Sequence, residues 1–168
     1  MQFAMLPAQG IAQGAQPILS YNYGAGDAAR VKKTFRILLI TCLSYSVILW
    51  SFVMLFPRAF SSLFTPDAAL LDFTAPMLRI YFAGMVMFGI QIACQMTFVS
   101  LGKAGCSVIV AVVRKFVLIL PLIYIMPHLV SDPTRGVFTA EPIADLTAVI
   151  FTAILFAFQF RKALQKTV

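Results

Sequence analysis

Long runs of uncharged, mostly apolar residues dominate the pattern along this chain. Residues 37–57 form one run of 21 without a charge, and residues 80–102 form a second run of 23. About 20 apolar residues in a helix cross the hydrocarbon core of a bilayer, which is roughly 30 Å thick. A helix also satisfies its own backbone hydrogen bonds, as lipid requires. Both runs therefore predict transmembrane helices.

Glycine, proline and charged residues divide the chain into five helical segments. We predict a single membrane domain over residues 1–168, with spans at approximately 1–23, 37–57, 76–101, 106–127 and 142–160 and a cytoplasmic tail at 161–168. The first segment contains Pro7, Pro17 and three glutamines, so it is expected to be a polar, bent helix that does not face lipid. Its Gly10 and Gly14 permit close helix approach. Residues 27–36 are expected to form a basic amphipathic connection along the cytoplasmic surface.

Proline also predicts where the later helices begin and end. The Thr-Pro-Asp sequence at 65–67 has the form of a helix start, and Glu-Pro at 141–142 opens the last segment in the same way. Pro121 is expected to bend the fourth segment. Outer loops are then expected at 59–64 and 128–140.

Composition and charge placement favour a membrane protein. The chain is 61% hydrophobic and 11% charged, whereas soluble domains are about 25% charged. Thirteen Lys and Arg against six Asp and Glu give a net charge of +7, which in a soluble protein would indicate nucleic-acid binding. Eight of the basic residues instead fall at alternate helix ends: Arg30, Lys32, Lys33, Arg36, Lys103, Arg161, Lys162 and Lys166. This positive-inside pattern predicts a cytoplasmic carboxyl terminus and no nucleic-acid partner.

Residues suited to catalysis or metal binding are sparse. Cys42, Cys94 and Cys106 have neither disulfide nor metal-ligand spacing, so they are expected to act as small buried apolar residues. His128 is the only histidine, and no acidic residue falls in the interior of a predicted span. We therefore expect no metal site, no cofactor and no enzymatic activity.

Four polar residues inside the predicted spans are the candidates for function. Arg114 and Lys115 are costly in a membrane, so they either snorkel or lock the bundle, or they face a transport path. Gln91 and Gln95 are one helical turn apart and share a face. They either line a cavity or hydrogen-bond neighbouring helices together.

Motifs spread over nearly the whole chain resemble those of one transporter family. Residues 17–26 read Pro-Ile-Leu-Ser-Tyr-Asn-Tyr-Gly-Ala-Gly, and residues 98–105 read Phe-Val-Ser-Leu-Gly-Lys-Ala-Gly. Arg114 then precedes Leu-Pro-Leu at 120–122 and Pro127, and Ala-Glu-Pro-Ile-Ala-Asp follows at 140–145. In this order they resemble the multidrug and toxic compound extrusion (MATE) transporters.

The resemblance implies a fold and an activity. MATE transporters have twelve helices in two six-helix lobes around a central cavity, and they export drugs against Na⁺ or H⁺. By resemblance, the five segments correspond to helices eight to twelve, a partial second lobe that lacks its amino-terminal partner lobe. The chain would be part of a plasma-membrane antiporter exchanging Na⁺ or H⁺ for organic, cationic compounds, and incomplete alone.

The resemblance also assigns candidate residues and reveals a departure. Gln91 and Gln95 would offer polar contacts to the substrate, and Arg114 would hold the lobe together or meet an anion. Tyr21 and Asn22 would shape a helix end near the cytoplasmic gate. The family's coupling carboxylates lie in the first helix and, in some branches, the seventh and tenth. The first and seventh are missing here, and the third segment, counterpart of the tenth, has no acid after position 72.

Two other functions stay open from the sequence. A flippase for lipid-linked sugars would need a large cationic cavity once the other lobe is added. A truncated, non-transporting membrane protein would be degraded or would co-purify with a partner.

Overall fold

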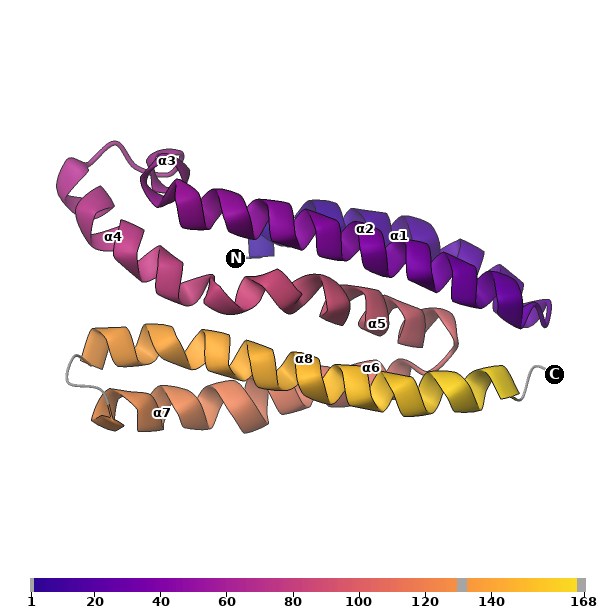
Figure 1. Cartoon of the computed structure of the whole chain (residues 1–168). Helices are drawn as coiled ribbons and strands as arrows, with labels where there is room; N and C mark the ends of the chain where they lie inside the picture. Colours follow the sequence, from indigo (N-terminus) through magenta and orange to yellow (C-terminus); the bar gives the residue numbers. More distant parts are fainter. Residues whose placement is uncertain (1, 130–132, 166–168) are drawn as a thin grey trace.

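The computed structural model describes residues 2–129 and 133–165, and every element in these ranges is a helix (Figure 1). The elements are α1 Gln2–Gly24, α2 Ala28–Leu55, α3 Pro57–Ser62, α4 Ala68–Tyr81, the 3₁₀ helix η1 Ala83–Met87, α5 Phe88–Ser100, α6 Ala104–Val112, the π-helix η2 Val113–Ile119, α7 Leu120–Leu129 and α8 Pro133–Gln165. Asp132 and the end of the predicted tail, with Lys166, lie outside the described residues.

Four stretches of the described residues are long and apolar enough to cross a membrane: Ala28–Leu55, Ala83–Ser100, Ala104–Leu129 and Gly136–Gln165. This confirms an all-α membrane helical bundle. The stretch that contains α5 is the most enclosed, with 56% of its 18 residues buried, whereas only 11% of an apolar 18-residue segment of the α6–α7 stretch is buried. The 23-residue α1 is not among the four, so its crossing of the membrane stays a prediction.

Helix α5 lies between two layers of helices. On one side it packs against α1 and α2, and on the other it packs against α8, which in turn carries α6, η2 and α7 (Figure 1). The α1–α2 turn, the α5–α6 turn and the carboxyl end of α8 lie together at the right of the view. Most of the basic residues of the positive-inside pattern therefore lie at one end of the bundle. That this end faces the cytoplasm stays a prediction.

The predicted connection at 27–36 is wrong, because α2 already begins at Ala28. The Asp27 side chain accepts a hydrogen bond from the Arg30 backbone N–H at 2.9 Å, which caps the helix. The basic residues that follow form the first turns of a helix longer than the bilayer is thick.

The predicted outer loops are also wrong, because both contain helix. Pro57 begins the short helix α3, and Asp67, rather than Thr65, caps α4 by accepting from the Ala69 backbone N–H at 2.9 Å. Helix α7 continues to Leu129, and α8 begins at Pro133, eight residues before Glu141. The Glu-Pro pair thus lies inside α8, since membrane helices tolerate an internal proline.

The backbone before Pro121 widens into the π-helix η2. Proline has no N–H to donate, and the preceding Leu120 N–H donates to Lys115 O, five residues back. The wider turn is where Arg114 and Lys115 are placed. Single π-helical turns of this kind are frequent at functional sites.

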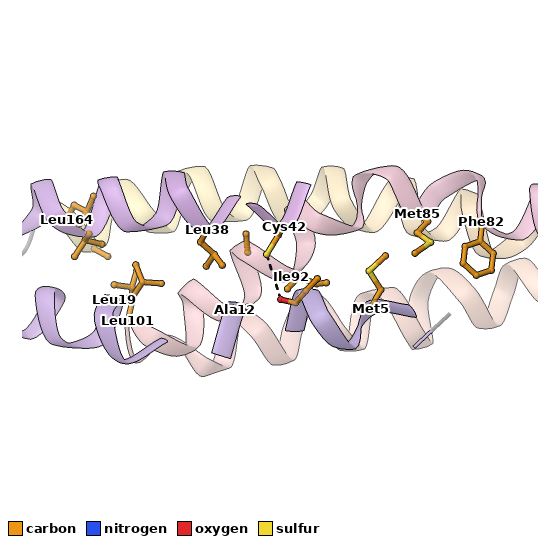
Figure 2. Close-up of a cluster of buried hydrophobic side chains, with 14 of the residues drawn as sticks. Met5, Ala12, Leu19, Leu38, Cys42, Phe82, Met85, Ile92, Leu101 and Leu164 are labelled. Atoms are coloured by element: carbon orange, nitrogen blue, oxygen red, sulfur yellow. Dashed lines mark hydrogen bonds between the residues drawn. The ribbon is translucent and has the colours of Figure 1, made fainter. Parts of the chain in front are cut away.

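Buried hydrophobic side chains form the core between α1, α2 and α5 (Figure 2), and this core includes one close backbone approach. A Cβ at Gly89 in α5 would lie 2.5 Å from the Cys42 carbonyl oxygen in α2, so only glycine lets the helices meet here. The Cys42 thiol donates to the Ala8 carbonyl at 3.8 Å. By contrast, Gly10 and Gly14 have no heavy atom within 4 Å of such a Cβ, so the close approach is at Gly89 and not at that pair.

The cysteines behave as the sequence indicates. Cys42 and Cys94 are buried, Cys106 is half-buried, and all three are free thiols.

Candidate functional site

A cavity of about 500 Å³ opens between α1, α5, α8 and the α6–η2 segment. Its lining combines amides, aromatic rings, thioethers and charges: Gln9, Gln13, Gln91, Gln95, Tyr81, Phe88, Met5, Met96, Arg114, Lys115 and Glu141, with Ile92, Val99, Ser107 and Ala111. Small-molecule sites typically have volumes of roughly 300–1,000 Å³, with mostly apolar walls and a few convergent polar groups. The structure thus offers space for a small organic molecule.

The two glutamines chosen from the sequence both line this cavity. Gln91 is buried, and its Oε1 has no hydrogen-bond partner among the described residues. Gln95 is half-buried one turn further along α5. Both glutamines thus border a cavity, and their contact with a substrate stays a prediction.

Arg114 is held by α8 rather than by the membrane surface. Its Nε and Nη2 lie 2.7 and 2.6 Å from Oδ1 of Asp145, and Nη2 lies 3.6 Å from Glu141 Oε1. The guanidinium also stacks 4.7 Å from the centre of the Phe88 ring. The side chain is 13% exposed, so Arg114 ties η2 to α8 and does not snorkel. It also lines the cavity, and a place for it in a transport path stays a prediction.

The acidic partners of Arg114 were not predicted from the sequence. No acid was expected in the interior of a span, but Glu141 and Asp145 both lie in the apolar stretch Gly136–Gln165, and the Asp145 side chain is 0% exposed. That expectation was wrong because the start of α8 was placed too late. Two signals could have found the pair: the i, i+4 spacing that puts both acids on one helix face, and the need of a buried arginine for a partner.

Tyr21 and Asn22 are not brought to the cavity. Tyr21 is 75% exposed. Asn22 is buried, and its Nδ2 donates to the Ile18 backbone carbonyl at 2.8 Å. The backbone carbonyl of Asn22 accepts from the Asp27 backbone N–H at 3.0 Å. Asn22 therefore shapes the end of α1, and a role for either residue at a gate stays a prediction.

The MatE family model matches residues 1–125 of this chain. The chain belongs to this family. This match confirms the resemblance indicated by the motifs. The relatives described below are transporters.

Among the relatives, the Multidrug export protein MepA of Staphylococcus saprophyticus is 23% identical to this MatE chain over 157 residues, or 92% of the chain and 34% of MepA. MepA of Staphylococcus aureus matches with the same identity and coverage. The chain thus spans about a third of the length of the curated relatives it matches.

Solved structures agree on the fold. The MATE multidrug transporter DinF-BH is similar with a TM-score of 0.86 and 32% identity, over 98% of this chain and 36% of that one. A MATE structure in the bent conformation superposes with a TM-score of 0.90 at 17% identity, over 99% and 36% of the two chains. The second likeness concerns the fold alone.

Proposed function

We propose that this chain is most of the carboxyl-terminal lobe of a secondary active multidrug efflux transporter. The complete protein would exchange Na⁺ or H⁺ for organic, cationic compounds across the plasma membrane, with the tail of this lobe in the cytoplasm. The cavity of about 500 Å³ between α1, α5 and α8 is the observation that carries the proposal.

The chemistry of the cavity wall supports binding of organic compounds. Aromatic rings and methionines adapt to apolar surfaces of varied shape, and Tyr81, Phe88, Met5 and Met96 all line the cavity. The glutamine amides donate and accept hydrogen bonds, so they orient a ligand without demanding one charge. Such a wall suits many substrates, in keeping with the multidrug export named for both MepA relatives.

The lobe would work as one half of an alternating-access machine. Cargo would bind between this lobe and the amino-terminal lobe, and ion binding would bias the equilibrium between outward- and inward-facing states. The matched lengths support this division, because the chain covers about a third of each relative. On its own, the chain would bind cargo without moving it.

The wall gives less support to a lipid-linked sugar flippase. That cargo carries phosphates and would need strong positive charge. Here the Arg114 guanidinium is paired with Asp145 and lies near Glu141, which itself borders the cavity. The partial neutralisation of Arg114 therefore favours organic compounds over phosphate-bearing ones.

Reading the coding DNA upstream of Met1 is the first test, because we expect seven further spans in frame. The longest product should then be reconstituted in vesicles and assayed for efflux of ethidium under a Na⁺ or H⁺ gradient. Gln91→Leu should lower efflux by about fivefold, the effect of one polar contact, and Gln16→Leu, outside the cavity, serves as the matched control. Vesicles that hold folded protein but move no cation under either gradient would contradict the proposal.

A further inference from the structure

We propose that Asp145 is a proton-binding site of this lobe, and that Arg114 passes from Asp145 to Glu141 when the proton arrives. The inference rests on the proposed ion exchange and names its ion as H⁺. It starts from an asymmetry in the buried ion pair. Nε and Nη2 of Arg114 both contact Oδ1 of Asp145, and neither donates to Oδ2.

The second oxygen of Asp145 is the unusual group. Oδ2 is buried and has no hydrogen-bond partner among the described residues. A buried carboxylate normally fills its remaining lone pairs, since leaving a charged acceptor without a donor in a medium of low polarity is costly. An oxygen in this state is the natural place for an added proton.

The surroundings of Asp145 contain charges of both signs. Arg114 and Lys115 face it from η2, Tyr81 from α4, and Glu141 from the preceding turn of α8. Helix η1 presents no ionisable side chain but brings Gly84, whose Cβ position lies 3.2 Å from the Asp145 Cβ and 3.1 Å from the Pro142 backbone. The site is thus tightly packed, with Glu141 as its link to the cavity.

Protonation of Asp145 would weaken its hold on Arg114. A hydronium ion from cavity water gives its proton to Asp145, an O–H bond forms at Oδ2, and water leaves. The carboxyl becomes neutral, so its attraction for the guanidinium falls, while Glu141 keeps its negative charge 3.6 Å from Nη2. Arg114 then pairs with Glu141 in place of Asp145.

This transfer links the proton to the cargo. Before it, Arg114 Nη2 lies 3.6 Å from Glu141 Oε1, an ion-pair contact that is too long for a hydrogen bond, so Glu141 at the cavity wall keeps acceptor positions for an organic cation. After it, the Arg114 guanidinium occupies Glu141 and displaces that cation. Proton uptake and cargo release would therefore be two sides of one event, as exchange requires.

A sodium ion suits this site poorly. Hard cations are held by about six oxygen ligands, whereas Asp145 offers one unpaired oxygen beside a guanidinium. A proton needs only the one oxygen.

Infrared difference spectroscopy of the chain in lipid nanodiscs tests the site directly. Stepwise acidification should produce the carbonyl band of a protonated carboxylic acid, and isotope-labelled aspartate should move that band. Asp145→Asn should abolish it. Asp72→Asn, at an exposed residue paired with Arg58, should leave it unchanged.

Two further variants keep the test decisive. If Asp145→Asn does not fold because Arg114 loses its partner, the neutral double variant Arg114→Gln/Asp145→Asn removes both charges together and should also lack the band. Glu141→Gln should weaken the band relative to the wild-type chain at the same acidic pH, because Arg114 then has no second carboxylate. A band that survives the loss of Asp145, or no aspartate band at all in the wild-type chain, would overturn the inference.

The coupling ion is tested in the same sample. Replacing choline with Na⁺ at constant pH should leave the aspartate band in place, and its disappearance would show a sodium site instead. The result is separable from the proposed function. Proton uptake at Asp145 without efflux by the longest in-frame product in vesicles would count against the transporter alone, whereas efflux by that product without the Asp145 band would count against the proton site alone.

Discussion

Replacing Gly89 with alanine should force α2 and α5 apart at their closest point. The added Cβ would lie 2.5 Å from the Cys42 carbonyl oxygen and 2.7 Å from the Leu43 nitrogen, where ordinary contact begins at 3.4 Å. The helices must therefore separate by about 0.9 Å at this point. Neither clashing atom can rotate away, because both belong to backbone.

The cost can be bounded from these distances. Overpacking of this kind costs about 1–3 kcal/mol, and a rigid clash with backbone favours the upper end. Alanine recovers about 1 kcal/mol through its higher helix propensity, so we expect a net loss of about 2 kcal/mol. Gly14→Ala is the matched control, since nothing lies within 4 Å of its Cβ position, and it should gain stability rather than lose it.

The assay is unfolding in mixed micelles by titration with dodecyl sulfate, followed by the fluorescence of Trp50, the single tryptophan. The midpoint should fall for Gly89→Ala and stay or rise for Gly14→Ala. Equal midpoints for the two variants would refute the reasoning, because they would mean that α2 and α5 do not meet in backbone contact at this glycine.

Three further outcomes are expected. Arg114→Met should cost about 3–5 kcal/mol in the same titration because it strands the buried Asp145, whereas Arg114→Met/Asp145→Leu should cost less; equal losses would contradict the ion pair. Lys103→Met should lower the thermal midpoint, since Lys103 Nζ donates to the side chain and backbone oxygens of Gln159 at 2.7 and 3.0 Å, and an unchanged midpoint would count against that tie. Maleimide should label the half-buried Cys106 well before the two buried cysteines, and equal rates in the folded protein would contradict their burial.

The uncharged runs predicted the positions of the membrane helices better than the residues at which those helices begin and end. The uncharged run at 37–57 lies almost wholly within α2, and the run at 80–102 contains all of η1 and α5. The errors concern helix starts at 28 and 133, where charged and proline residues were interpreted as loop. A helix continues past the hydrocarbon core wherever water can solvate its side chains, so the loss of apolar pattern marks the bilayer boundary and not the end of the helix.

The candidate site was predictable only as far as local spacing reaches. Gln91 and Gln95 share a face of one helix, and that face does line the cavity. Arg114 was identified by the energetic cost of its charge. Its partner Asp145 lies 31 positions away. The i, i+4 spacing of Glu141 and Asp145 indicates an acidic helix face, but only the packing of α8 against η2 shows that this face meets Arg114.

The unequal enclosure of the helices has an evolutionary consequence. We expect the exposed sides of α6 and α7 to meet lipid tails, where apolar side chains of different shapes fit equally well. Sequence drift among related lobes should therefore accumulate there as exchanges of Leu, Ile, Val and Phe. Helix α5 packs against helices on two sides, so each of its side chains must match the shape of its neighbours. Substitutions in α5 should therefore accumulate slowly.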